Sequence, residues 1–271
     1  MGKGNMRRFV LLFLGLSFWA LAEPAPFLRE VETLYPERYQ RPVLERILAL
    51  YEQALAADPQ NQELLVRLAQ HWYEWGVLMP EPEEDEGWRK AADYAFRALG
   101  LTGLDEALRL SNEQFQEFVR KATDARALLW AGHGWGQLLG KMNPFSAFFA
   151  LPKIRAIYER AMELDPTYMG GSAPQAYGAL LANLSDYGIL FGVKLSEAKR
   201  YFEWAIQIDP TYLDNYVAYA KEYAVRAKDR ALFESLLRHV LDAPIGNWPF
   251  WNRMAKDRAA ELLAKIDKYF R

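Results

Sequence analysis

The chain has 271 residues, of which 51% are hydrophobic, 14% aromatic and 25% charged, with a formal net charge of -2. This composition supports a large buried core and excludes disorder over most of the chain. No cysteine is present, which excludes disulfides, thiolate metal ligands, a cysteine nucleophile and a lipid on an N-terminal cysteine. No basic cluster is present that would favour nucleic-acid binding.

The first 22 residues have the layout of a secretory signal peptide. Basic residues at positions 3, 7 and 8 precede an apolar run from Phe9 to Ala22, which ends in a small-x-small motif before Glu23. The run is shorter than the roughly 20 residues that a membrane-spanning helix needs. We therefore expect cleavage after Ala22 and an exported protein that is not a lipoprotein and has no membrane span after cleavage. The alternative is an uncleaved N-terminal helix that anchors the chain.

One sequence pattern recurs along the chain. It occupies Tyr51–Pro59, Tyr158–Pro166 and Phe202–Pro210, with a weaker copy at Tyr94–Thr102 that lacks the proline. In each full copy an aromatic residue stands three positions before an alanine, and Asp-Pro begins four positions after it. Alanine allows a neighbouring helix to approach closely, and the residue before a proline is disfavoured in a helix. Each Asp-Pro therefore predicts a helix end.

The spacing of the copies indicates a helical repeat. Ala54 and Ala98 are 44 residues apart, as are Ala161 and Ala205, and 34 residues separate the proline of the last copy from Pro244. A period of 34 residues is that of the tetratricopeptide repeat (TPR). The longer units are interpreted as the same helix pair with about ten inserted residues.

Three insertions interrupt these units. Pro80–Gly87 is acidic, whereas Met142–Pro152 and Leu184–Val193 are apolar. Apolar loops are unusual on a soluble protein, so both are expected to contact an internal or external partner.

The remaining segments have a helical hydrophobic period, and none alternates with the period of a strand. They are Leu64–Trp75, Ser111–Ala131 and Met254–Phe270. The predicted fold class is all-α, a TPR-like α-solenoid or compact helical bundle of about eleven to thirteen helices with loop insertions. Residues 23–271 are expected to form one domain after the signal peptide at residues 1–22.

An ordered set of residues resembles a known family, the TatT proteins, which are TPR proteins associated with tripartite ATP-independent (TRAP) transporters. The set consists of Trp130-Ala-Gly-His-Gly-Trp-Gly136, Leu151-Pro152, Asp165-Pro-Thr-Tyr168, Gly170-Gly171 and the helix Leu195–Phe202. The resemblance covers roughly residues 28–241. It implies a periplasmic helical protein with cryptic TPR units that assembles as a homotrimer and pairs with a periplasmic solute-binding protein. Many relatives are lipoproteins, and this chain departs from them in having no cysteine.

The function implied by the resemblance is that of a periplasmic binding and scaffold component of a TRAP-type solute uptake transporter. Such a component docks a solute-binding protein and can hold a small, partly apolar organic ligand. The alternative is a generic exported TPR adaptor that organises envelope protein complexes without a solute pathway.

No catalytic site is predicted. The three histidines, His71, His133 and His239, have no metal-ligand spacing, and neither a metal nor a cofactor is expected. The Ser196-x-x-Lys199 motif lacks the further elements of a serine acyl-enzyme. Ser196 is instead expected to cap the start of a helix. The protein is therefore not expected to be an enzyme.

The helix that contains Gly132, Gly134 and Gly136 is the most informative candidate site. Each glycine inside a helix costs about 0.8 to 1 kcal/mol relative to alanine, so three of them need a compensating close contact. That contact is either a tight helix crossing or a wall approached by a ligand or a subunit axis. In the second case aromatic and amide side chains supply the lining, and the candidate ligand-binding residues are Trp130, His133, Trp135, Gln137, Tyr168, Gln175, Tyr177, Asn183 and Tyr187.

Overall fold

The computed structural model describes residues 26–141, 144–187 and 192–270. Within these ranges the chain forms 14 α-helices, one 3-10 helix and one π-helix, and no strand. The predicted all-α class is confirmed. The signal peptide predicted at residues 1–22 lies outside the described residues, as do parts of the two apolar insertions. The helices are α1 (Pro26–Leu34), η1 (Tyr35–Glu37), α2 (Arg41–Ala57), α3 (Gln62–Leu78), α4 (Glu84–Ala98), α5 (Leu104–Arg109), α6 (Asn112–Lys121), α7 (Ala125–Gly140), α8 (Pro144–Leu164), α9 (Tyr168–Ser185), α11 (Leu195–Ile208), α12 (Asp214–Ala218), η2 (Tyr219–Ala224), α13 (Arg230–Asp242), α14 (Pro249–Ala264) and α15 (Ile266–Tyr269).

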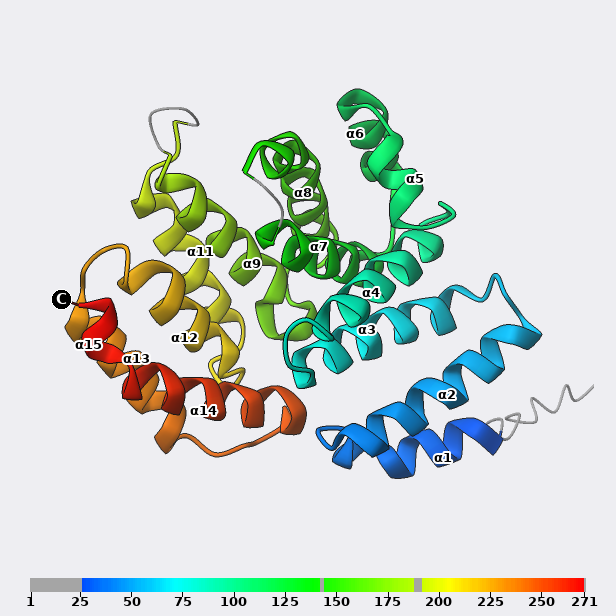
Figure 1. Ribbon diagram of the computed structural model, residues 1–271, viewed down its shortest axis with the longest axis horizontal. Helices are drawn as coiled ribbons and strands as arrows, with labels where there is room; N and C mark the ends of the chain where they lie inside the picture. The colour runs from blue at the N-terminus through cyan, green and yellow to red at the C-terminus, as the bar shows by residue number, and fades with distance from the viewer. Residues whose placement is uncertain (1–25, 142–143, 188–191, 271) are drawn as a thin grey trace, which may run out of the picture.

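The helices form an arc whose two ends meet (Figure 1). The most extensive packing joins α3 with α4, α9 with α11, and α4 with α7. The arc runs from α1 and α2 through α7, α8 and α9 to α13, and α14 then returns to contact η1. At this closure the Arg38 guanidinium lies over the Phe250 ring, 5.5 Å from its centroid. Residues far apart in sequence therefore meet where the arc closes.

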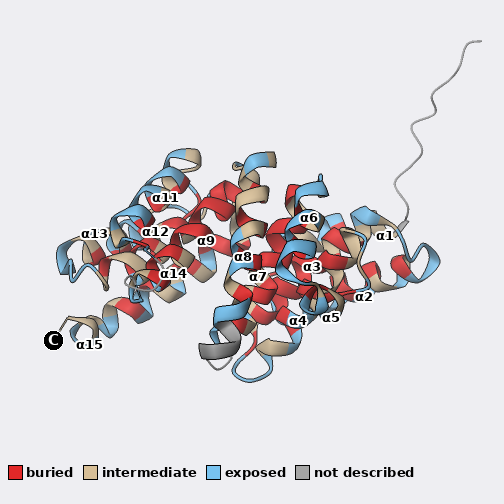
Figure 2. Cartoon of the chain, turned by 90° about the horizontal axis from the view of Figure 1, so that it is seen from above, coloured by how far each residue is buried: buried red, intermediate tan, exposed pale blue. Residues whose placement is uncertain are grey.

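The buried side chains form two clusters. The larger one extends from α1 to α11 and includes Phe250 and Trp251 at the start of α14. The smaller one joins α12, η2, α13 and α14 around Phe233 and Leu237. Figure 2 shows buried faces along the middle of α3, α7 and α9, with exposed residues gathered in loops and at helix ends. The central helices α3, α7 and α9 are therefore buried over most of their surface, whereas α11 and α13 bury one face and leave another in solvent, as expected for an amphipathic helix.

The predicted Asp-Pro helix ends are confirmed. α2, α8 and α11 end directly before Asp58, Asp165 and Asp209. In the second and third copies the Asp carboxylate accepts hydrogen bonds from the backbone N–H and the hydroxyl of the threonine two residues later, at 2.6 to 2.9 Å. The side chain thereby satisfies donors in the turn that follows the helix.

The structure corrects three local expectations. The segment Ser111–Ala131 is two helices, because Asp124 accepts hydrogen bonds from the backbone N–H groups of Arg126 and Ala127 and so starts α7 anew. The segment Met254–Phe270 is the later part of α14 followed by α15. α11 begins at Leu195, and the side chain of Ser196 therefore does not cap it.

Candidate functional site

Aromatic side chains from four helices meet where the arc closes. This central cluster consists of Tyr73 on α3, Trp130 and His133 on α7, Tyr158 on α8 and Trp251 on α14. The Tyr73 ring centroid lies 5.7 Å from that of Trp130 and 5.3 Å from that of His133. Trp130 and Trp251 stack at 6.3 Å, and His133 lies 5.8 Å from Tyr158. The cluster therefore joins the middle of the chain to its C-terminal part.

His133 is the polar centre of this cluster. Its Nδ1 lies 3.1 Å from the Tyr158 hydroxyl and its Nε2 lies 2.9 Å from the Ser172 hydroxyl. Burial lowers the pKa of His133 to about 4, against a smaller opposing effect of the Asp214 charge. The ring is therefore neutral at pH 7, with one nitrogen donating a hydrogen bond and the other accepting one. His133 therefore has a hydrogen-bonded role within the packed cluster.

A left-handed turn presents the start of α9 to this cluster. Met169, Gly170 and Gly171 have φ values of 52°, 63° and 84°. At Gly170 an added Cβ would lie 2.7 Å from the Cβ of Tyr212, so glycine is required for space as well as for conformation. The turn places Ser172 beside His133 and lets the Tyr168 hydroxyl accept a hydrogen bond from Trp130 Nε1 at 3.2 Å.

Two predicted amides lie at the edge of the central cluster. Gln137 is exposed and donates a hydrogen bond to the Tyr73 hydroxyl at 3.0 Å. Gln175 is buried and donates to Asp214 at 2.9 Å, and Asp214 also forms an ion pair with Arg258 at 2.9 Å. The Asp214 charge raises the pKa values of both Tyr73 and His133.

The other four predicted residues do not join the central cluster. Trp135 packs against Phe96 and Phe115, because it stands two residues after His133 and so faces another side of α7. Elsewhere, the Tyr177 hydroxyl donates to a glutamate on α8, Asn183 accepts from an arginine after η2, and Tyr187 is 57% exposed. A ligand-binding role for any of the nine residues stays a prediction.

Helix crossing accounts for two of the three glycines on α7. An added Cβ at Gly132 would lie 2.9 Å from the Tyr158 ring of α8. At Gly134 it would lie 2.5 Å from the Trp88 carbonyl oxygen of α4. Gly136 has only an ordinary contact, at 3.5 Å from the Tyr158 hydroxyl. The first two glycines therefore allow α4 and α8 to approach opposite sides of α7.

A buried polar network beside α3 was not predicted. Glu74 is fully buried and accepts hydrogen bonds from Arg38 at 3.2 Å, Gln70 at 3.0 Å and His71 Nδ1 at 2.8 Å. Burial by itself raises the pKa of Glu74, but the Arg38 charge and the His71 contact outweigh it and lower that pKa to about 2. The sequence signal is Gln70, His71 and Glu74, which share one face at helical spacing in the largely apolar second half of α3.

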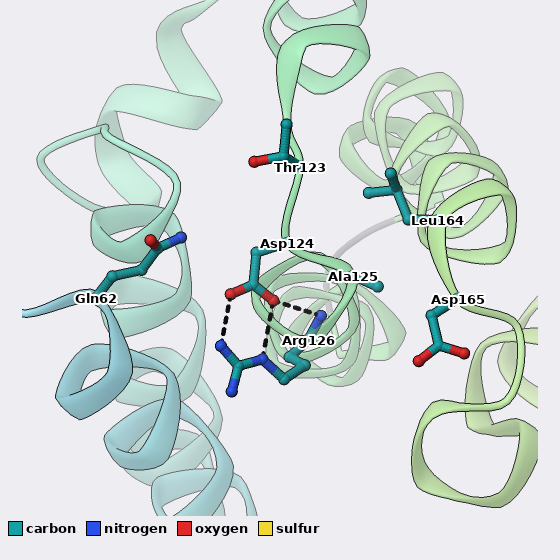
Figure 3. A pocket seen from close by; sticks show the side chains of 7 residues that line it. All are labelled: Gln62, Thr123, Asp124, Ala125, Arg126, Leu164 and Asp165. Carbon is teal, nitrogen blue, oxygen red and sulfur yellow. Dashed lines mark hydrogen bonds and ion pairs between the residues drawn. The ribbon is translucent and has the colours of Figure 1, made fainter. Parts of the chain in front are cut away.

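Two hollows lie on the surface around the start of α3. The first has a volume of about 470 Å³ and is polar (Figure 3). In it Gln62 and Asp165 stand on opposite sides of Asp124 and Arg126, which form an ion pair at 2.9 Å. Arg126 also reaches Glu63 at 2.7 Å. The second hollow is a groove of about 1160 Å³ between α1, α2 and α3, and Glu63 is one of the residues that line it.

None of the described helices combines the length and apolar character needed to cross a membrane. Within the described ranges, no three acidic or imidazole side chains are grouped as metal ligands.

A search of curated protein sequences found no match. The sequence model of one family, described as the TRAP transporter T-component (TAtT), matches residues 41–270, which extend from the start of α2 to the end of the described chain. The chain therefore belongs to the TRAP transporter T-component family.

Proposed function

We propose that this protein is a periplasmic binding and scaffold component of a TRAP-type uptake transporter, which forms a homotrimer and docks the solute-binding protein of that transporter. The observation that carries the proposal is the match to the T-component family over residues 41–270. The signal-peptide layout of residues 1–22 supports export.

Exposed aromatic side chains at the start of α8 suit the docking role. Phe148 and Phe149 are 47% and 55% exposed, and their rings contact each other at 5.7 Å. They belong to the apolar insertion Met142–Pro152, whose composition favours contact with a partner. Aromatic residues are enriched at the centres of protein interfaces, where their burial contributes most of the binding energy.

The central cluster suits a second part of the proposal, the holding of a small, partly apolar ligand. Trp130, His133 and Tyr168 come together there, with Gln137 and Gln175 at the edge. An aromatic wall with a few oriented polar groups is the usual composition of a small-molecule site.

Light scattering and binding measurements on the exported protein test the proposal. We expect a trimer and direct binding to the solute-binding protein of the same transporter. A Phe148→Ser, Phe149→Ser double variant should bind that partner about tenfold more weakly or worse. The control variant Leu241→Ser, which changes a 38% exposed leucine on α13, should bind as the original protein does. A monomer that fails to bind the solute-binding protein would refute the proposal.

A further inference from the structure

The groove between α1, α2 and α3 exists because the first repeat carries small side chains where the other repeats carry large ones. Ala57 lines the groove, and the equivalent positions in the second and third copies are Leu164 and Ile208. Asn61, which also lines it, stands where the other copies have Tyr168 and Tyr212. The first repeat therefore has an open volume at a place where the repeat pattern has bulky side chains.

The same comparison distinguishes Tyr51. Its equivalent Tyr158 shares a hydrogen bond with His133, and its equivalent Phe202 has no hydroxyl. The Tyr51 side chain is 5% exposed and lines the groove, and its hydroxyl has no hydrogen-bond partner among the described residues. The hydroxyl is not one of the fully buried side-chain atoms that lack a partner. It therefore opens into the groove, where it can donate a hydrogen bond to a ligand.

Arg67 brings unused cationic donors to a lining whose other charged side chains are Arg46, Glu30, Glu32 and Glu63. Its Nε donates to Glu63 at 2.8 Å, and its two terminal nitrogens have no hydrogen-bond partner in the described part of the chain. Arg67 and Tyr51 both line the groove, and the Arg67 charge opposes the rise in the pKa of Tyr51 that burial causes. The fork of an arginine matches the two oxygens of a carboxylate. Arg67 and Tyr51 together offer such a group three donors.

The rest of the lining is largely apolar. Phe27, Val31, Leu50, Ala54 and Leu64 border the groove, and the Phe27 and Tyr51 rings meet edge to face at 6.3 Å. The other arginine in the lining, Arg46, already pairs with Glu30 at 2.7 Å. The volume of about 1160 Å³ is ample for a small organic molecule.

We propose that this groove is a binding site for a small carboxylate with an apolar body, whose carboxylate lies between Arg67 and Tyr51 and whose apolar part lies along α1 and α2. The site is separate from the central cluster and from the exposed aromatic pair of α8. A negative result for this site would not affect the proposed docking function.

The site is tested by calorimetric titration of the protein, in the form that remains after processing in the cell. The two ligands are octanoate and its neutral analogue octanamide. We expect octanoate to bind and octanamide to bind at least about tenfold more weakly, because one charge-assisted contact is worth about that factor. Arg67→Gln and Tyr51→Phe should each weaken octanoate binding, the first by about tenfold or more. Ala57→Leu, at an exposed position, should abolish it by restoring the bulk of the other repeats.

A matched control separates binding from general charge effects. Arg238 pairs with Glu234 at the same four-residue spacing as Arg67 with Glu63, but it lies on α13 away from the groove. Arg238→Gln should bind octanoate as the original protein does, and circular dichroism should show every variant folded. Absence of octanoate binding to the original protein, or binding to the Arg67→Gln and Ala57→Leu variants that is as strong as to the original protein, would overturn the proposal.

Discussion

Buried polar side chains connect η1, α3 and α14 where the arc closes. Arg38 follows η1, lies over Phe250 of α14, and forms an ion pair with Glu74 of α3. Both members of the pair are nearly inaccessible to solvent, so their loss of hydration must be balanced by mutual attraction and by additional hydrogen bonds. Gln70 and His71 supply those bonds to Glu74. The network therefore specifies how η1, α3 and α14 meet.

Removing one charge of this pair should be more harmful than removing both. Glu74→Gln leaves the Arg38 guanidinium buried without its counter-charge, and we expect a loss of about 3 to 5 kcal/mol in the free energy of unfolding. Adding Arg38→Met should restore part of that loss, because the unpaired charge is then gone. Urea unfolding of both single variants and the double variant measures the coupling. Additive losses would show that the two side chains do not act as a pair.

The low pKa of His133 should make stability depend on pH. The folded pKa is about 4, below the ordinary 6.5. Between these values the unfolded chain takes up a proton that the folded chain does not. The contribution of His133 is therefore complete above pH 6.5 and is lost as the pH falls toward 4. Between pH 7 and pH 5 the original protein should lose roughly 2 kcal/mol more than a His133→Gln variant. Equal losses in urea unfolding would contradict this assignment.

Helix α7 packs against α3, α4, α8 and α9. Its glycines determine how closely α4 and α8 approach it. α4 and α8 cross it at Gly134 and Gly132, where added methyl groups would meet backbone or ring atoms. Gly140, at the end of the same helix, has no atom within 4 Å of such a methyl group. One helix therefore contains both a glycine required by packing and a glycine without that constraint.

This contrast gives a matched pair of substitutions. Gly134→Ala should destabilise the protein by about 1 to 3 kcal/mol, because rigid backbone of α4 must move away. Gly140→Ala should be neutral or should stabilise by up to about 1 kcal/mol, through the higher helix propensity of alanine. Thermal unfolding of the two variants measures the difference. A similar midpoint for both would show that α4 does not approach α7 as closely as described.

Local sequence signals predicted the elements of this fold better than they predicted its contacts. The Asp-Pro helix ends and the close approach at the α7 glycines follow from short-range rules, and both are observed. The break at Asp124 was missed because the hydrophobic period continues across it. Two of the predicted site residues, Trp130 and Tyr168, form a hydrogen bond with each other. A third, His133, contacts Ser172, which was not predicted. Arg38 and Glu74 are 36 positions apart in the sequence, so no local signal indicated their pairing.

The division of the core into two clusters should govern how the whole molecule opens. The larger cluster extends from α1 to α11, whereas the smaller one is confined to α12, η2, α13 and α14 with α15 packed on it. The end of a repeat array packs against one neighbour only and so is held by fewer contacts. We expect amide hydrogens of α13 and α15 to exchange by local opening, at lower free energy than those of α3 and α7.

Two leucine substitutions of equal burial test this at the scale of the molecule. Leu68 on α3 and Leu237 on α13 are both fully buried, one in each cluster. Each change to alanine should cost about 3 kcal/mol locally. Leu237→Ala should speed hydrogen exchange mainly in α12 to α15, since the larger cluster keeps its own contacts. Leu68→Ala should speed exchange in both regions, because the C-terminal helices rest on α9, α11 and the start of α14, which belong to the larger cluster. Exchange that rises equally everywhere in the Leu237→Ala protein would instead show that the arc, closed by α14 on η1, opens only as a single unit.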